Sequence, residues 1–214
     1  MSRMQRRVMM SVLGVVICGL SVGLFKRAAL GVDPFQSLMS GLDAVIPIGF
    51  GTLYVLVNAL LLLFSIIFDR HKIGIATVIN LFLVGYVAEF SLNQLLAWFP
   101  ELSLAGRFIM LLIGIVIMCF ASAFYFTADL GVSVYDAISL VLSERQDKVP
   151  FRFCRIISDL ICVLSGTALC LFSGMSWQEV FGVVGIGTII TAFFMGPLID
   201  FFNVHVARPF LERA

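Results

Sequence analysis

Six apolar runs, each about as long as a lipid bilayer is thick, divide this sequence of 214 residues. A helix needs about 20 residues to cross about 30 Å of hydrocarbon. Only 13% of the residues are charged, whereas about 25% is usual in a soluble domain. We therefore predict an all-α integral membrane protein in a lipid bilayer. The six predicted transmembrane helices lie near 8–25, 51–68, 74–97, 108–127, 155–173 and 180–202.

The basic residues divide unequally between the two sides of the predicted helices. If the N-terminus is cytoplasmic, Lys26, Arg27 and Arg107 lie outside and the remaining eleven Lys and Arg residues lie inside. Cytoplasmic loops carry an excess of Lys and Arg, and tryptophan is enriched at membrane interfaces, where Trp98 and Trp177 are predicted to lie. We therefore expect a multi-pass protein of the cytoplasmic (inner) membrane with both termini cytoplasmic.

The first apolar run resembles a signal peptide, because basic residues precede it in "MSRMQRRVMMSVLGVVICGL". The same pattern recurs at the start of the second half, where RFIMLLIG (107–114) follows RVMMSVLG (7–14) at a spacing of 100. A cleavable leader has no reason to be copied inside the protein. We therefore expect the first run to be a retained transmembrane helix.

The two halves of the sequence repeat each other. LGVDPFQSL (30–38) aligns with LGVSVYDAI (130–138) at an offset of 100. For the third helix the offset is 111, and GIATVINLFLVGYVAEF (74–90) shares 7 of 17 positions with GIGTIITAFFMGPLIDF (185–201). Unrelated apolar helices match at Leu and Val, whereas these match at glycines, a threonine and a terminal acid. The sequence therefore contains an internal duplication.

Each copy of the duplication contains three predicted spans. Because three is an odd number, the second copy enters the membrane from the opposite side, which is the inverted-topology organisation of many secondary transporters. We predict a 3+3 inverted repeat in a single membrane domain of residues 1–214, with repeat 1 at 7–98 and repeat 2 at 107–203.

A short half-helix is predicted after the first span of each repeat, at about 33–46 and 133–145. An N-cap followed by proline, or a Ser-x-x-Asp capping box, begins a helix, and glycine allows a sharp turn before it. The candidate residues are Gly31, Asp33 and Pro34 in repeat 1, and Gly131, Ser133 and Asp136 in repeat 2. We expect interfacial or re-entrant half-helices. As full spans they would give a parallel repeat and would move "SERQDK" (143–148) outside, which the distribution of basic residues opposes.

The Leu-Gly-x-x-Pro element, its paired short helix and the Gly-Ile-Gly-Thr…Gly-Pro-Leu-Ile run near the C-terminus resemble the YczE/YyaS/YitT family of bacterial multi-pass membrane proteins. The resemblance covers nearly the whole chain and implies a helical membrane fold. In that family the first element looks like Pro-Trp-Asp. Here it reads Pro34-Phe35-Gln36, without the carboxylate, while Tyr135-Asp136 retains one in the second copy. Gln36 and Asp136 are therefore included among the candidate substrate- or ion-binding residues.

Asp159 is the strongest candidate functional residue, because an ionisable side chain inside a bilayer costs several kcal/mol. Arg155 lies one turn earlier, a spacing that suits an ion pair. At an offset of 101, Asp159 aligns with Asn58 in the second span. Two interpretations remain open: a structural ion pair with Arg155, or a proton- or cation-coupling carboxylate that faces a central cavity together with Asn58.

Glu89 and Asp200 end the third span of each repeat, either as gates on opposite sides or as helix-end carboxylates in interfacial water. Gly85 and Gly196, one turn earlier, are predicted to let another backbone approach closely. Four further polar residues of these spans either line a solute track or bond to neighbouring helices and their own carbonyls. They are Thr77, Asn80, Thr188 and Thr191.

No sequence signal points to an enzyme, a metal site or a cofactor. GLSVG (19–23) matches the Gly-x-Ser-x-Gly pattern of hydrolases, but inside a span we expect Gly19 and Gly23 to form a close-packing Gly-x-x-x-Gly pair. His71 and His205 lack the spacing of metal ligands. The five cysteines, without a C-x-x-C, predict apolar packing. An intramembrane hydrolase with Asp159 and Asp200 as a dyad is the enzymatic alternative, although nothing in the sequence brings these two residues together.

These patterns predict a secondary transporter of an unidentified small solute, in which one repeat rocks against the other and Asp159 is a candidate for proton coupling. Two alternatives stay open: a membrane-embedded capture subunit of an energy-coupled transporter, and an accessory or scaffold protein that transports nothing. A homodimer or a partner membrane protein is compatible with all three. The net charge of +1 gives no reason to expect nucleic acid as a partner.

Overall fold

The computed structural model describes residues 3–69, 73–131, 133–135, 137–138 and 151–212, and every regular element in these ranges is helical. The long helices are α1 (Arg3–Ala28), α3 (Phe50–Asp69), α4 (Ile75–Trp98), α5 (Leu104–Ala128), α7 (Phe151–Phe172) and α9 (Ile186–Phe202). The short ones are α2 (Pro34–Val45), α8 (Trp177–Val183), the π-helical segment η2 (Asn203–Ala207) and α10 (Arg208–Glu212).

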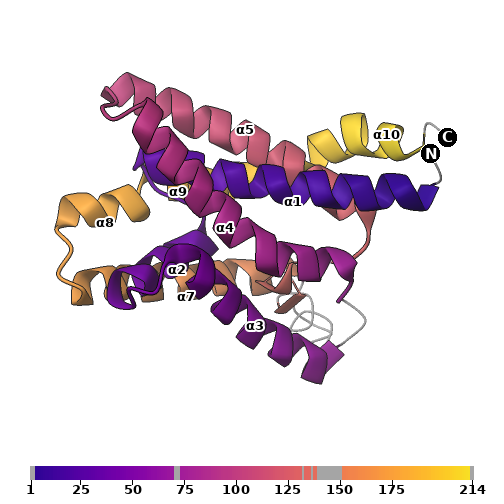
Figure 1. Ribbon diagram of the computed structural model, residues 1–214, viewed down its shortest axis with the longest axis horizontal. Coiled ribbons are helices and arrows are strands. Elements are labelled where there is room, and N and C mark those ends of the chain that lie inside the picture. The colour runs from indigo at the N-terminus through magenta and orange to yellow at the C-terminus, as the bar shows by residue number, and fades with distance from the viewer. Residues whose placement is uncertain (1–2, 70–72, 132, 136, 139–150, 213–214) are drawn as a thin grey trace.

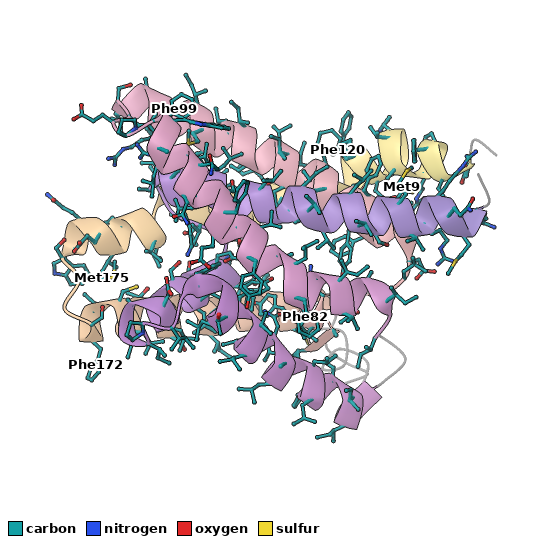
Figure 2. The ribbon with its side chains drawn as sticks, viewed as in Figure 1. Met9, Phe82, Phe99, Phe120, Phe172 and Met175 are labelled. Atoms are coloured by element: carbon teal, nitrogen blue, oxygen red, sulfur yellow. The ribbon has the colours of Figure 1, made fainter. Side chains whose placement is uncertain are left out.

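Five helical stretches are long and apolar enough to cross a membrane. Large apolar side chains also cover the outside of the molecule; Phe172, for example, is 83% exposed and projects away from the end of α7 (Figure 2). Such an exterior is expected of a protein surrounded by lipid. The prediction of an all-helical membrane protein is therefore confirmed. The five stretches are Arg3–Ala28, Phe50–Ile67, Ile75–Trp98, Leu104–Ala128 and Trp177–Glu212.

Helices α1 and α5 pack against each other as an antiparallel pair (Figure 1). The two helices approach closely at glycines that correspond to each other in the two halves. A Cβ atom at Gly14 would lie 3.0 Å from the Cβ of Tyr125, and one at Gly114 would lie 3.1 Å from the ring of Phe25. Small residues let two backbones come together in a membrane, where packing drives helix association. This pair therefore joins the two halves of the chain.

A second close contact holds α4 against α1. A Cβ atom at Gly19 would lie 2.8 Å from Val87, and one at Gly23 would collide with the side chain of Ser91. Between them, the hydroxyl of Ser21 donates to the carbonyl oxygen one turn earlier, at 2.9 Å. The predicted Gly-x-x-x-Gly contact is therefore confirmed.

The turns that follow α1 and α5 each pack against the first turn of a helix from the other half. The backbone N–H of Gly187, in α9, donates to the carbonyl oxygen of Leu30 at 2.7 Å. The N–H of Ala76, in α4, donates to the carbonyl oxygen of Leu130 at 3.1 Å. The donors and the acceptors occupy corresponding positions in the two aligned halves. Each half thus supplies a hydrogen-bond acceptor to a helix N-terminus of the other.

Glycine is required in both turns. Gly31 has φ of 109° and Gly131 has φ of 115°, a left-handed region that glycine occupies without steric cost. A Cβ atom on Gly31 would also lie 2.7 Å from the nitrogen of Gly185, and one on Gly131 would lie 2.5 Å from the nitrogen of Gly74. Conformation and space therefore both exclude a side chain at these two positions.

Helix α2 begins where the sequence predicts. Asp33 is its N-cap and accepts a hydrogen bond from the N–H of Gln36 at 3.2 Å, and Pro34 is the first helical residue. Its 12 residues extend roughly 18 Å, well short of a bilayer crossing, so the alternative of a full span is excluded for this segment. It packs against α7 where Gly41 faces Gly166. Of its counterpart at 133–145, only 133–135 and 137–138 are described.

The two halves differ in how their third helices are supported. α4 packs against α3, and a Cβ atom at Gly85 would lie 2.6 Å from Tyr54. α9 packs mainly against α5 instead, and nothing lies within 4 Å of a Cβ atom at Gly196. The prediction of a close backbone approach is therefore confirmed at Gly85 and wrong at Gly196. The physical reason is that α9 stands away from α7 and borders a cavity.

The two ends of the chain lie at the same end of the molecule (Figure 1). α10 contacts α1, and near this end Arg7 donates to the carbonyl oxygen of Ala128 at 2.6 Å and forms an ion pair of 2.8 Å with Asp129. Arg27, at the other end of α1, donates to the carbonyl oxygens of Phe99 and Pro100. Arginine side chains thus close the backbone turns at both ends of α1.

We expect Gly31→Ala to destabilise the protein by more than about 1 kcal/mol, because alanine is strained at positive φ and its methyl group has no space. The measurement is thermal unfolding of the purified protein in detergent. Gly196→Ala is the matched control: this glycine is helical with open space beside it, and alanine is the better helix former. A Gly31→Ala variant with the same unfolding temperature as the native chain would contradict this account of the turn.

Candidate functional site

A cavity of about 360 Å³ lies at the centre of the molecule, between α1, α2, α3, α4, α5, α7 and α9. Both halves of the chain line it. Half of the candidate residues picked from the sequence meet there, although they are spread over more than 150 positions of the chain. They are Asp33, Pro34, Gln36, Asn58, Asn80, Ser133, Asp159 and Thr191.

Asp159 is held by a tyrosine. The hydroxyl of Tyr135 donates to Oδ1 of Asp159 at 2.6 Å, a short distance typical of a hydroxyl bound to a carboxylate. The Tyr135 ring stacks on Phe35 with centroids 4.9 Å apart, and Phe35 meets Tyr54 edge to face at 5.9 Å. No sequence pattern marks these aromatic residues as functional, although Phe35 and Tyr135 occupy equivalent positions in the two repeated elements.

The cavity contains two carboxylates. Asp159 accepts from Tyr135, and Asp33 accepts from the first turn of α2. Among the lining residues that the structure describes, none is Lys, Arg or His. The carboxylate oxygens of these two residues are hydrogen-bond acceptors, which suit a ligand with hydrogen-bond donors.

Two buried amides in the cavity have an unused acceptor. Gln36 is 4% exposed and Asn80 is 7% exposed, and within the described part of the chain neither Oε1 of Gln36 nor Oδ1 of Asn80 has a hydrogen-bond partner. Asn58, in contrast, donates to the carbonyl oxygen of Tyr54 at 2.8 Å. A buried polar group without a partner costs about 1–3 kcal/mol. Such groups fit a site whose hydrogen bonds are completed by a bound molecule.

Four candidate residues have structural contacts outside the polar cavity. Thr77 accepts from the N–H of Gly74 at 3.2 Å, and Thr188 accepts from the N–H of Gly185 at 3.3 Å, so each threonine caps the first turn of its own helix. Gly31 and Gly131 form the turns described above. Thr191 lines the cavity and donates to the carbonyl oxygen of Thr188 at 3.0 Å.

The ion pair predicted between Arg155 and Asp159 falls partly outside the described residues. The Arg155 backbone belongs to α7, but its side chain is not described, and neither is Asp136. The candidate capping box of Ser133 with Asp136 also lies partly outside the described residues, because Asp136 is not described. The carbonyl oxygen of Ser133 accepts a hydrogen bond from the N–H of Ala137 at 2.9 Å.

Glu89 joins a small charged cluster away from the cavity. It accepts from the N–H of Gly51 at 3.0 Å, at the start of α3. The Lys26 ammonium lies 3.1 Å from the centre of the Phe50 ring, a cation–π contact. Burial raises the pKa of the nearby Asp43 carboxyl; Lys26 opposes that shift and Glu89 adds to it. This cluster ties together α1, α2, α3 and α4.

Asp200, the counterpart of Glu89 in the second half, lies exposed near the end of α9. The corresponding positions of its half carry Phe126 in place of Lys26 and Ser143 in place of Asp43. The second half therefore lacks residues that match Lys26 and Asp43 in charge, and its sequence does not repeat the charged cluster of the first half.

A second cavity, of about 860 Å³, lies between the start of α5, α7, α8 and the first half of α9. Its walls are mostly apolar. Pro34, Asp159 and Ala192 line both cavities, so the two are neighbours and the carboxyl group of Asp159 lies at their junction.

The described residues contain no group of three or more His, Cys, Asp and Glu side chains that could hold a metal ion. Four of the five cysteines are buried and the fifth, Cys18, is partly buried, and none of these five forms a disulfide bond.

We expect Tyr135→Phe and Asp159→Asn to be energetically coupled, because a hydrogen bond to a charged group contributes about 1.5–3 kcal/mol. Tyr135→Phe removes the bond and Asp159→Asn removes the charge that strengthens it, so the double variant is less destabilised than the sum of the singles. The measurement is a double-mutant cycle of unfolding free energy in detergent. Additive effects contradict a direct bond; Tyr86→Phe, an exposed tyrosine of α4, is the control for loss of a hydroxyl.

Comparison with known proteins places the chain in a family. The model of a family of unknown function (DUF6198) matches residues 5–204. The chain is 25% identical over 201 residues to the uncharacterized protein YyaS of Bacillus subtilis, and these residues cover 94% of each of the two chains. It is also 25% identical over 190 residues to the uncharacterized membrane protein YczE of the same bacterium, covering 88% of this chain and 81% of YczE.

An uncharacterized protein of Haemophilus influenzae is 26% identical over 193 residues, which cover 90% of this chain and 81% of that protein. No solved structure matches the chain. The resemblance to YyaS and YczE predicted from the sequence is confirmed. The chain therefore belongs to the family of unknown function DUF6198, whose model covers nearly its whole length.

Proposed function

We propose that this protein is a secondary transporter, and not an enzyme, which carries a small solute across the bacterial inner membrane. The observation that carries the proposal is the central cavity, because polar side chains from both halves of the chain line it. Asn58 and Asp159 occupy corresponding positions in the two halves, as do Asp33 and Ser133. Transporters built from repeats bind their solutes at the interface between the repeats, near the middle of the bilayer.

The proposed architecture has six spans in two inverted repeats. The reciprocal hydrogen bonds from Gly187 to Leu30 and from Ala76 to Leu130 support it, as does the antiparallel pairing of α1 with α5 (Figure 1). The sixth span is α7, whose apolar part Ile156–Phe172 is shorter than the other five. The whole helix of 22 residues is about 33 Å long, which is enough to cross a bilayer.

The proposed orientation puts both termini in the cytoplasm. An even number of spans returns the chain to the side on which it started, and the two ends lie together in the structure (Figure 1). The excess of Lys and Arg on this side supports the same orientation.

The cavity extends toward the proposed cytoplasmic side. Phe126 and Ile199, which line it, lie close to the C-terminal ends of α5 and α9, and these ends are near the chain termini. At the opposite side, the cluster of Lys26, Phe50 and Glu89 joins the helices of the first half. We assign this arrangement to an inward-facing state, in which Glu89 belongs to the closed outer gate and Asp200 to the open inner one.

Asp159 is the proposed coupling residue. A carboxylate inside a bilayer is costly unless it has a role, and this one lies on the cavity wall, where it accepts a hydrogen bond from Tyr135. Asp33 lines the same cavity. Protonation of Asp159 removes one negative charge from the site, and it therefore changes the affinity for any solute that senses that charge.

The test is a thermal-shift screen of the purified chain against amino acids, organic anions, amines, vitamins and small amphiphiles. It is run at two pH values, one near neutrality and one near the ordinary pKa of an aspartate. A ligand at about 100 times its dissociation constant stabilises a protein by about 2.7 kcal/mol. We expect a ligand whose effect changes with pH and is lost in Asp159→Asn, but is kept in Glu101→Gln, a loop carboxylate outside both cavities.

Uptake of the same ligand into proteoliposomes, driven by a pH gradient, completes the test. Tight binding that is independent of pH, without uptake, would favour a capture subunit that needs a partner. A well-folded protein that responds to no compound in the screen would favour an accessory role. Either result would overturn the proposed transport activity.

We also expect the buried side-chain oxygens of Gln36 and Asn80 to lower the stability of the protein and to contribute to ligand binding. Gln36→Met and Asn80→Leu replace a buried acceptor that has no described partner with an apolar group of similar size, so the free energy of unfolding rises by about 1 kcal/mol or more. Ligand binding falls in both variants. Asn58→Leu is the matched control, because its amide already donates to Tyr54; this variant loses stability. Loss of stability in all three variants would show that the two amides are satisfied structural residues.

A further inference from the structure

The described helices form two groups, and neither group coincides with one half of the chain. In the first group, α1 packs against α4 and α5, and α5 packs against α9; we call these four helices the scaffold. In the second group, α2 packs against α3 and α7; we call these three helices the bundle. Figure 1 shows the bundle below α1 and α5 in the view. Among the described helices, the main contact between the two groups is that of α3 with α4.

The contacts inside the scaffold occur in both halves of the chain. A Cβ atom at Gly19 of α1 would lie 3.1 Å from the carbonyl oxygen of Val84 in α4. At the corresponding positions of the second half, the thiol of Cys119 in α5 donates to the carbonyl oxygen of Met195 in α9 at 3.8 Å. The glycine contacts between α1 and α5 are paired in the same way. If the two halves exchange their conformations, as inverted repeats can in a transporter, the scaffold therefore stays as it is.

The contact between the bundle and the scaffold occurs in one half only. In the first half, a Cβ atom at Gly85 of α4 would lie 2.6 Å from Tyr54 of α3, and Glu89 accepts from the first turn of α3 at 3.0 Å. In the second half, nothing lies within 4 Å of a Cβ atom at Gly196, and Asp200 is exposed. An exchange of conformations between the halves therefore opens the contact of α3 with α4 and closes that of α7 with α9.

Both cavities lie between the bundle and the scaffold. The cavity of about 860 Å³ separates α7, where Leu160 lines it, from α9, where Ile189 lines it. Its space allows α7 to approach α9. The central cavity is lined by Asp159 of the bundle and by Asn80 and Thr191 of the scaffold. A movement of the bundle therefore changes the shape of the candidate solute site.

The bundle has internal contacts that hold it together as one body. A Cβ atom at Gly41 of α2 would lie 2.6 Å from the carbonyl oxygen of Gly166 in α7. The hydrogen bond from Tyr135 to Asp159 joins the described start of the second half-helix to α7. Phe35 of α2 contacts both Tyr135 and a tyrosine of α3. Because close-packed groups of helices are not continuously deformable, we expect α2, α3 and α7 to move together.

The turns that lead into the bundle are attached to the scaffold. The carbonyl oxygen of Leu30 bonds to α9 and that of Leu130 bonds to α4, and these two bonds are again equivalent in the two halves. Helix α2 begins at Pro34, a few residues beyond the first turn. A rotation of the backbone between this turn and Pro34 moves the bundle without breaking either bond, because a hinge needs only a few loop residues that change their dihedral angles.

We propose that the protein alternates between two states by rocking of the bundle against the scaffold, so that each moving body contains helices of both repeats. In the structure the bundle rests on α4. In the second state α7 packs on α9, Gly196 lies against the backbone at Arg155, which aligns with Tyr54, and α3 separates from α4. This inference rests on the proposed transport function and specifies its moving parts. Rocking of one repeat against the other would instead break the contacts of α1 with α5 and of α2 with α7.

The test measures distances between spin labels in the full-length chain, reconstituted in liposomes, by pulsed electron paramagnetic resonance. The five cysteines are first replaced by alanine, and an unfolding temperature equal to that of the native chain shows that this variant is folded. If the replacement lowers that temperature, the native cysteines, which are buried or partly buried, are kept and their labelling is subtracted as background.

Cysteines introduced at four lipid-exposed sites give four informative pairs. The sites are Leu60 of α3, Phe82 of α4, Leu164 of α7 and Phe194 of α9, all more than half exposed and outside the lining of both cavities. Leu60 with Phe82, and likewise Leu164 with Phe194, join the bundle to the scaffold within one repeat. We expect two distances for each of these pairs, in the same proportions.

The other two pairs lie within one body and join the two repeats. They are Leu60 with Leu164 in the bundle, and Phe82 with Phe194 in the scaffold. We expect one distance for each of them. Rocking of one repeat against the other gives the opposite pattern, with two distances for these pairs and one for the pairs within a repeat.

Two variants should shift the balance between the states in opposite directions. Glu89→Ala removes the acceptor that joins α4 to the first turn of α3, so we expect the ratio of the second state to the first to rise about tenfold. Gly196→Leu fills the space into which α7 moves, so the second distance should disappear. The matched controls, Glu101→Ala in a loop and Phe201→Leu on the exposed side of α9, should leave the proportions unchanged.

The outcomes separate this inference from the proposed function. Two distances for a pair within one body overturn the division into bundle and scaffold. One distance for all four pairs, in the labelled native chain and in Glu89→Ala, overturns the movement. If either result is found and the protein still takes up a solute in proteoliposomes, the inference fails and the transport proposal stands. The expected distances in a protein to which no solute binds would overturn transport and leave the movement.

Discussion

Two backbone turns at Leu30 and Leu130 determine much of this structure, because a peptide group inside hydrocarbon has no water to bond with. Each turn interrupts a helix, and its exposed carbonyl oxygen accepts from the first turn of a helix in the other half. Gly31 and Gly131 make the approach close enough. Since the bonds cross between halves, neither half satisfies its own backbone, and the interruptions are tolerated only in the assembled protein.

The same connections leave the halves different in shape. In the first half, α3 and α4 meet at Gly85, and the cluster around Lys26 and Glu89 holds neighbouring helices together. In the second half, α9 leans on α5 and leaves space beside Gly196. Similar sequences thus form one packed and one open arrangement. The proposed rocking between two states requires a motif that can adopt two such packings.

The central cavity illustrates a conflict between stability and binding. Some of its side chains interact with each other: Tyr135 donates a hydrogen bond to Asp159 and stacks on Phe35. The buried oxygens of Gln36 and Asn80 have no hydrogen-bond partner in the described part of the chain, and unsatisfied groups of this kind lower stability. A protein that only needed to pack its helices would place apolar residues there. In the proposed transporter, these polar groups bind the solute that enters and leaves the cavity.

Local properties of the sequence were sufficient for the helices, the lipid-facing composition, the start of α2 at Asp33 and Pro34, and the glycine contacts of α1, because each depends on nearby residues or on a short periodic pattern. The sequence also pointed to Asp159 and Asn58 through their alignment. It did not reveal that Tyr135 holds Asp159, that Thr77 and Thr188 cap their own helices, or that Gly196 borders open space. These features depend on how far α9 stands from α7 and on which helix ends meet across the halves, and such distances arise only when all the helices pack together.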